Sequence, residues 1–242
     1  MKAFLVFLVL LVVVAVGADF GAKYYAEQQV ATALHQEQGL AVDPSVSITG
    51  FPFLTQLAAG RYTRVDVAAA GVDAPNLGPV TVSASLHDVA LPASQVFSGN
   101  VGTFTVGRAD TVVRVPQTTL GAQLNVPDLQ VSPGSTKPGS AQLVGTVSLA
   151  GLLSQTVTVD VDLSVSGGNL VVRATDAALG APGSNQTRLP SIVAPALLAQ
   201  ISRTIPLEQQ PFGITTTGVS VQGSDLVVDG TGQNVTVQPT RQ

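Results

Sequence analysis

Residues that commonly perform catalysis are few and scattered in this chain. The sequence has no cysteine, and its two histidines, His35 and His87, each lack a partner histidine at metal-ligand spacing. Asp160 and Asp162 lie two residues apart, as paired carboxylates do in acid–base or cation sites. Threonines share their side of the chain, however, which favours a solvated strand face. A Gly-x-Ser-x-Gly nucleophile elbow is also absent. The residue types therefore predict no catalytic residue, no metal site and no cofactor.

Apolar side chains, by contrast, are concentrated in the segment from Gly50 to Val67. The whole chain has only eight Phe and three Tyr, yet this segment carries a cluster of aromatic and leucine residues, namely Phe51, Phe53, Leu54, Leu57 and Tyr62. Pro52 restrains the turn between two of the aromatic residues, and the pattern predicts a short helix over Phe53–Ala59. The cluster has two interpretations. It is either a corner of the core or an apolar lip where a lipid enters.

Two arginines, Arg61 and Arg64, follow this cluster. Guanidinium groups suit phosphate, so both are candidates for contact with a lipid head group. The alternative is that they pair with Asp66 on the face of a strand, and the sequence leaves both interpretations open.

A second apolar segment is predicted to form a helix over Pro190–Thr204. It is apolar around most of its circumference, which is typical of a helix buried on more than one side. A groove between this helix and a sheet would admit acyl chains. The groove candidates on the helix are Ile192, Val193, Leu197, Leu198 and Ile201.

Alternating residues predict that most of the remaining chain is β-strand. The clearest case is Gln155–Gly167, where valines and one leucine alternate with Thr, Asp and Ser. Leu170–Thr175 returns as the second arm of a hairpin. Another hairpin is predicted from Thr217–Val221 and Asp225–Asp229, and Asn234–Gln238 is expected as a last strand.

The pattern predicts an α+β fold that is mostly antiparallel β. Val80–Leu91 and Phe104–Val115 each change phase midway, which indicates a bulge or a strongly twisted sheet. One to two helical turns are expected over Pro116–Gln123. A long, curved or twisted sheet must close, stack or wrap around a helix. We therefore expect it to wrap around the C-terminal helix.

The N-terminus predicts export. Ala3–Ala18 is uninterrupted by any charged or polar side chain, and Lys2 precedes it. Its reach of ~24 Å falls short of a ~30 Å hydrocarbon core. The segment is therefore either a signal peptide cleaved near Ala18 or an anchor extended by the helix predicted over Asp19–Gln38.

Beyond residue 18, we expect one domain over residues 19–242. The chain has a net charge of −4 and 11% charged residues. These values argue against a nucleic-acid binder.

The motifs Gly50-Phe-Pro-Phe-Leu-Thr-Gln-Leu57 and Gly60-Arg-Tyr-Thr-Arg-Val-Asp-Val67 resemble the signature of the LmeA-like phospholipid-binding proteins of actinobacterial envelopes. Leu86–Pro92 and the block Ile205–Ile214 agree with the family in order. The segment Gln130–Gln142 departs from it by being longer and richer in Pro and Gly. The resemblance extends from Met1 to about Val237.

The resemblance implies a non-enzymatic protein outside the cytoplasmic membrane. An uncleaved N-terminal segment would hold the domain close to the outer leaflet of that membrane. It implies binding of phospholipids, including phosphatidylinositol-type lipids, and support of lipoglycan or mannan assembly. It also implies a fold like the tubular, BPI-like lipid-binding proteins. The alternative function is a scaffold that binds envelope enzymes and carries no lipid.

Overall fold

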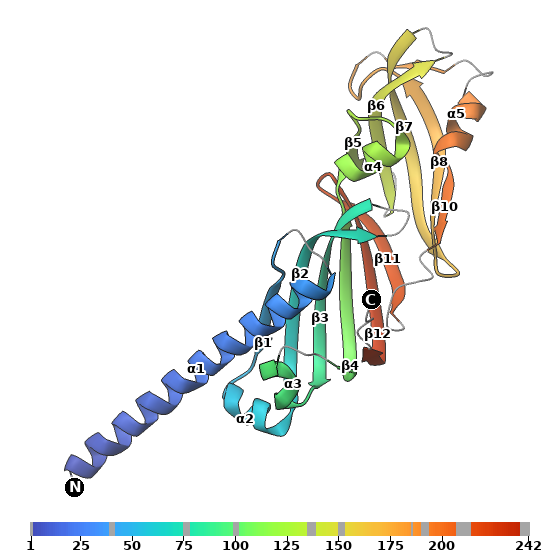
Figure 1. Cartoon of the computed structure of the whole chain (residues 1–242). Helices are drawn as coiled ribbons and strands as arrows, with labels where there is room; N and C mark the ends of the chain where they lie inside the picture. The colour runs from blue at the N-terminus through green and yellow to red at the C-terminus, as the bar shows by residue number, and fades with distance from the viewer. Residues whose placement is uncertain are drawn as a thin grey trace.

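Two antiparallel sheets and a long N-terminal helix make up the architecture of this protein (Figure 1). The computed structural model describes residues 2–38, 42–74, 78–98, 102–134, 139–149, 153–184, 186–189, 194–206 and 214–237. The molecule is elongated. The two sheets follow one another along its length, and the helix projects from the end of the first sheet (Figure 1).

The first sheet has six strands in the order β1-β2-β3-β4-β12-β11. In that order the strands are Ser45–Thr49, Arg61–Ala74, Gly78–Ala90, Phe104–Val115, Asp225–Val237 and Thr215–Gln222. The predicted C-terminal hairpin is confirmed as β11 and β12. The last predicted strand is not separate, because β12 continues through Asn234 to Val237.

The second sheet has the order β10-β8-β7-β6-β5, and β9 also pairs with β8. In that order, ending with β9, the strands are Arg203–Pro206, Asn169–Leu179, Leu153–Ser166, Ser140–Leu149, Gln130–Pro133 and Thr187–Arg188. The predicted hairpin around Gly167-Gly168 is confirmed as β7 and β8. The chain enters this sheet after β4 and returns to the first sheet with β11.

A kink across three strands explains the predicted phase changes. Asp88 on β3 and Asn234 on β12 both have left-handed backbones, with φ of 53° and 50°. The register places both opposite Gly107 on β4. Each strand keeps the same number of residues at this level, so the ladder is kinked rather than bulged. A Cβ on Gly107 would lie 3.0 Å from Cβ of Asp88, which favours glycine there.

The kink keeps one face of the first sheet apolar along its length. Core residues on this face lie three apart instead of two: Leu86 and Val89 on β3, and Val106 and Ala109 on β4. Ordinary alternation would place one member of each pair on the opposite face. The same face therefore packs against helix α1, Lys2–Gln38, at one end of the sheet and against the second sheet at the other.

The short helices are α2 (Phe53–Ala59), α3 (Ala93–Ser98), α4 (Gln117–Leu124) and α5 (Ala194–Ile201). The two helices predicted near residues 53 and 116 are confirmed. The C-terminal helix is shorter than predicted, because it ends at Ile201 and the chain continues as strand β10 from Arg203. Residues 190–193 at its predicted start lie outside the described residues.

Strand pairing is the reason that the C-terminal helix ends early. The hydroxyl of Ser202 accepts a hydrogen bond from the N–H of Ala174 at 3.0 Å. The next residues then pair with β8, with Arg203 opposite Val172 and Thr204 opposite Val171. The β-branched Thr204 and Ile205 suit this extended conformation.

The expected wrapping of one sheet around a C-terminal helix is therefore wrong. Helix α5 spans eight residues, or ~12 Å at ~1.5 Å per residue, and is too short to form the axis of a long sheet. It packs mainly on the second sheet, next to β8. The long helix of the molecule is N-terminal.

Helix α1 has two parts with different surroundings. From Val6 to Val14 each side chain is at least 51% exposed. Val6–Gln36 is apolar and long enough to cross a membrane by length and composition. The later part packs into the first sheet, where Ala26 is fully buried and Glu27 accepts the N–H of Ile48 on β1 at 2.7 Å. The helix continues without interruption through the predicted boundary at residue 18.

Asp19 fixes helix α2 against α1. Its side chain is 4% exposed. Its carboxylate oxygens accept the backbone N–H groups of Phe53 at 2.9 Å and Leu54 at 2.7 Å. These N–H groups begin α2, where helix geometry leaves them without a partner inside the helix. Pro52 precedes them and makes no side-chain cap, so Asp19 takes the role of an N-cap from a distant part of the sequence.

Substituting Asp19→Ala should lower the free energy of unfolding by about 1–3 kcal/mol, because the buried N–H of Phe53 then has no acceptor. Urea unfolding of the full chain in detergent measures the change. The matched control is Asp43→Ala, since Asp43 is 77% exposed and contacts only the His35 ring among the contacts identified. Equal effects of the two substitutions would contradict the capping role.

Candidate functional site

An apolar pocket of about 480 Å³ lies where the two sheets meet. Strands β5 to β8 and β10 form one side of it, β11 and β12 form the other, and helices α4 and α5 contribute to its walls. The apolar lining residues are Leu120, Leu124, Leu129, Val131, Ala141, Leu143, Val161, Leu163, Val172, Ile201, Ile205, Val221 and Leu226. The polar lining residues are Gln123, Arg203 and Thr204.

The alternation of β7 supplies the floor of the pocket. Val161 and Leu163 fall on the same strand face, and the register places Ala141 of β6 beside Val161. On the other side, Leu226 of β12 is 4% exposed and packs in the cluster that joins the two sheets. The pocket is thus an extension of the core at the place where neither sheet fully covers the other.

Helix α4 closes one wall of the pocket because the chain turns sharply after it. Asn125 takes a left-handed backbone at the end of the helix, and its N–H donates to the carbonyl of Ala122. A Cβ at Gly121 would lie 2.6 Å from the carbonyl oxygen of Val126, so only glycine allows this approach. The turn returns Leu129 and Val131 to the pocket lining.

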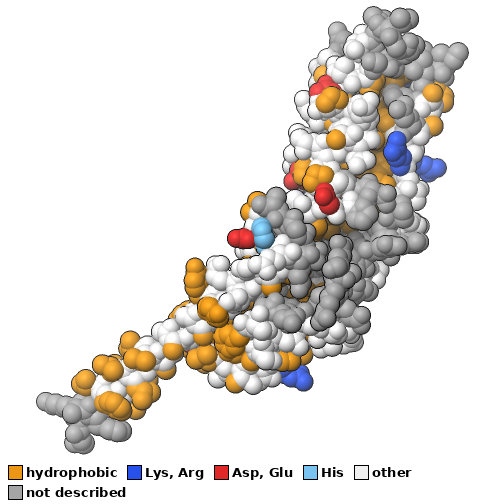
Figure 2. Space-filling model, viewed as in Figure 1, with side chains coloured by type: hydrophobic (Ala, Val, Ile, Leu, Met, Phe, Trp, Pro, Cys, Tyr) orange, Lys and Arg blue, Asp and Glu red, His pale blue; other side chains and the backbone are white. Residues whose placement is uncertain are grey.

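A smaller hollow of about 370 Å³ adjoins the apolar pocket and shares Val172, Arg203 and Thr204 with it. Arg173 on β8 and Arg203 on β10 both line it, and both are exposed. Figure 2 shows basic side chains next to hydrophobic ones in this half of the molecule. The margin of an apolar pocket therefore carries positive charge.

The predicted aromatic segment lies elsewhere. Helix α2 is at the end of the first sheet that carries α1, whereas the pocket is at the opposite end (Figure 1). Phe53 and Leu57 are buried in the first-sheet core, and the Phe53 ring lies 6.3 Å from that of Tyr62. Phe51 and Leu54 are exposed, at 64% and 39%. The interpretation as a corner of the core therefore holds for Phe53 and Leu57. A role at the surface stays a prediction for Phe51 and Leu54.

The predicted groove residues of the C-terminal helix are only partly described. Ile201 lines the pocket, and Leu198 packs into the second-sheet core. Leu197 lies within α5 but its side chain is outside the description, as are residues Ile192 and Val193 altogether. The structure does not bring the α5 residues and the α2 residues into one groove.

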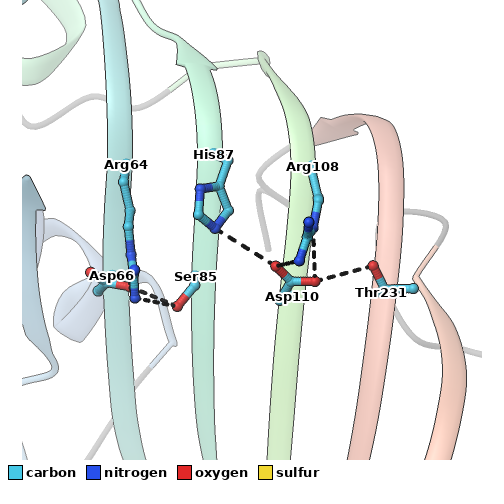
Figure 3. Close-up of polar contacts among 7 residues, drawn as sticks. All are labelled: Arg64, Asp66, Ser85, His87, Arg108, Asp110 and Thr231. Carbon is cyan, nitrogen blue, oxygen red and sulfur yellow. Dashed lines mark hydrogen bonds and ion pairs between the residues drawn. The ribbon is translucent and has the colours of Figure 1, made fainter.

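The predicted head-group arginines have different surroundings. Arg61 begins β2 and is exposed, and its proposed lipid contact stays a prediction. Arg64 pairs with Asp66, with a guanidinium nitrogen 2.8 Å from a carboxylate oxygen, and also donates to the hydroxyl of Ser85 at 3.3 Å (Figure 3). The alternative of pairing on the sheet face therefore holds for Arg64.

Arg64 belongs to a polar row that crosses the outer face of the first sheet. Next along the row, Arg108 and Asp110 of β4 pair at 2.7 Å, and Thr231 of β12 donates to Asp110 at 3.2 Å (Figure 3). His87 of β3 lies 3.7 Å from the same carboxylate. The hydrogen bond from Arg108 is the largest influence on Asp110 and holds the pKa of that carboxyl below its ordinary value.

The low pKa of Asp110 predicts a pH dependence. A carboxyl whose pKa is lowered by folding stabilises the protein at neutral pH, and this contribution is lost as the pH falls below about 4. Asp110→Asn should therefore lower the free energy of unfolding at pH 7 by no more than about 1 kcal/mol, because the pair is partly solvated. At pH 3 the difference from the unsubstituted chain should shrink.

Urea unfolding at both pH values measures this prediction. Asp73→Asn, at an exposed position of β2 in the same sheet, controls for the loss of a charge. A difference for Asp110→Asn that is the same at pH 3 and pH 7 would show that the ion pair does not stabilise the sheet.

Sequence reasoning missed most of the pocket. The alternation of β7 marked Val161 and Leu163 as inward-facing, but the contributions of α4, β5, β11 and β12 had no local signal. Leu124 and Val221, for example, are 97 residues apart in sequence (221 − 124) and line one pocket. Only the meeting of the two sheets brings them together.

Comparison with protein-family models matches residues 17–231 to the family described as LmeA-like phospholipid-binding. The match includes Asp19, all the pocket-lining residues and both sheets except the part of β12 beyond residue 231. Comparisons with curated proteins and with solved structures find no significant match. Because the family match covers most of the 242 residues, this chain belongs to the LmeA-like phospholipid-binding family.

Proposed function

We propose that this protein binds phospholipid outside the cytoplasmic membrane and holds acyl chains in the pocket between its two sheets. The observation that carries this proposal is an apolar pocket at the sheet junction in a chain of a phospholipid-binding family. Its volume of about 480 Å³ falls in the ~300–1,000 Å³ range of small-molecule sites. The protein would support envelope lipid or lipoglycan assembly as a carrier, without chemistry of its own.

Burial of the acyl chain supplies the binding free energy in this mechanism. Each methylene removed from water contributes ~0.8 kcal/mol. About ten methylenes in the pocket would therefore contribute ~8 kcal/mol before the entropy of ordering the chain is subtracted. A single acyl chain thus suffices for useful affinity, and nothing in the apolar lining selects among chains of similar length.

We assign binding of the lipid head group to the polar residues at the margin of the pocket. Arg203 and Thr204 line both hollows, and Arg173 lines the smaller one. A guanidinium group donates to phosphate in a fork of N–H groups. We place the phosphate of the lipid beside Arg203, with phosphatidylinositol-type lipids as the expected class by family resemblance. The likeness to tubular lipid-binding folds is part of the same proposal, supported by two twisted sheets around an apolar pocket.

The N-terminal helix supports the proposed location. Lys2 precedes the apolar stretch, and positive charge is retained on the cytoplasmic side of a membrane. The sheets would then lie outside the cytoplasmic membrane. They would be held next to its outer leaflet if the stretch is kept, and the protein would be a soluble shuttle if the stretch is removed.

Native mass spectrometry of the full chain, released from detergent, tests the lipid pocket. We expect phospholipid to co-purify and to be identified after solvent extraction. Leu163→Trp should lower the bound fraction roughly five-fold or more, because a larger side chain occupies the pocket floor. Val144→Trp is the matched control, since Val144 is on β6 and faces away from the apolar face.

A chain that carries no lipid and takes up none from vesicles would overturn the proposal and favour the scaffold alternative. Equal lipid occupancy in Leu163→Trp and Val144→Trp would place the lipid elsewhere. If Leu163→Trp fails to fold, as judged by circular dichroism, Ala141→Val introduces a smaller obstruction in the same lining.

A further inference from the structure

The surface around helix α2 carries exposed apolar side chains that do not line the lipid pocket. Beyond Val14, the exposed large hydrophobic side chains of the described residues are, apart from Val42, gathered near one turn of α1. They come from α1, α2, α3 and the loop before α2, and we call them the aromatic collar: Phe20, Tyr24, Tyr25, Phe51, Leu54 and Phe97.

Ring contacts join α1 to the two segments beside it. Phe20 of α1 stacks on Phe51 of the loop before α2, with ring centroids 6.2 Å apart. Tyr25 of α1 lies at the same centroid distance from Phe97 of α3. Figure 2 shows hydrophobic side chains continuing from the projecting helix onto the adjoining end of the sheet-bearing part. The collar is therefore one surface, continuous with the apolar helix.

The length of the apolar helix sets where a bilayer would end. Ala3–Ala18 reaches ~24 Å, and a hydrocarbon core is ~30 Å thick. The missing ~6 Å corresponds to about four further residues, which brings the boundary to the turn containing Phe20. Tyr24 and Tyr25 follow one turn later, in the position that aromatic residues prefer at a membrane interface.

Asp19 would oppose this placement if its charge met lipid, because ionised side chains are costly in the hydrocarbon region. Its side chain is 4% exposed, however, and both oxygens accept N–H groups of α2. The fold thus buries Asp19 at this boundary and leaves the aromatic rings around it exposed. Arg61, exposed immediately after α2, is at the end of the same segment, where its charge suits lipid phosphates.

We propose that the aromatic collar docks on the outer leaflet of a phospholipid bilayer, with the N-terminal helix retained as the anchor. The collar extends the short helix to the full hydrocarbon thickness and fixes the orientation of the domain. The pocket then lies at the end of the first sheet that is directed away from the bilayer (Figure 1). A lipid bound there has left the membrane.

Tryptophan depth measurement tests the collar directly, because the chain has no tryptophan. Phe51→Trp and Phe97→Trp place a single fluorophore at exposed collar positions. Val42→Trp is the matched control, since Val42 is 63% exposed and Phe51 is 64% exposed. Position 42 follows the end of α1. Along the helix, that end lies ~27 Å from Phe20 at ~1.5 Å per residue, so a tryptophan at position 42 is far from the collar. Val13→Trp calibrates the signal within the hydrocarbon.

The full-length variants are reconstituted in vesicles of phosphatidylcholine and phosphatidylglycerol, some of which carry nitroxide labels near the glycerol end of the acyl chain. We expect both collar tryptophans to emit at shorter wavelength than the control and to be quenched at least about two-fold more strongly. Failure of either collar position to exceed Val42→Trp would overturn the proposal. The readout reports depth alone, so an empty pocket would leave it unchanged.

Discussion

Asp19 is on the turn where helix α1 passes from exposed apolar residues to residues packed in the first sheet. Its carboxylate accepts the first N–H groups of α2, and this contact joins three parts of the molecule: the projecting helix, the aromatic loop and the sheet core. An unpaired carboxylate at 4% exposure would be strongly destabilising, and so would the N–H groups without it. Each group satisfies the other, so the helix cannot rotate or separate without leaving both unpaired.

The first sheet depends on a second constraint, the kink at the level of Asp88, Gly107 and Asn234. In regular strands with this sequence, the apolar residues on the two sides of Asp88 and Gly107 would face opposite sides of the sheet. Two left-handed residues on either side of a glycine reverse the phase in neighbouring strands together. The result is one apolar face long enough to receive α1 at one end and the second sheet at the other. The opposite face carries the ion pairs of Arg64 and Arg108.

The arrangement separates two kinds of apolar surface. The collar is open and aromatic, and it is continuous with a helix suited to lipid. The pocket is lined by aliphatic side chains from both sheets and has arginines at its margin. Aromatic side chains with polar tips suit an interface, whereas aliphatic walls suit an acyl chain. A protein built this way would hold a lipid at a distance from the bilayer to which it is attached.

The residues alone determined the local structure, because local structure depends on near neighbours in sequence. Alternation in Gln155–Gly167 determined a strand, the glycine pair after it determined a hairpin, and the uninterrupted apolar run determined the N-terminal helix. The aromatic signature also determined the family, since it is a run of adjacent residues. The chemistry of Arg64 was open in sequence because its partners depend on which strands are neighbours.

Tertiary structure alone decided where the pocket lies and where the C-terminal helix ends. The short α5 ends at Ile201 because β8 offers hydrogen bonds to the following residues, and this competition has no signal in the helix itself. The pocket joins side chains separated by most of a domain, such as Leu120 and Leu226. Its position follows from the place where the two sheets meet. Burial of both apolar faces fixes that place only once every strand has paired.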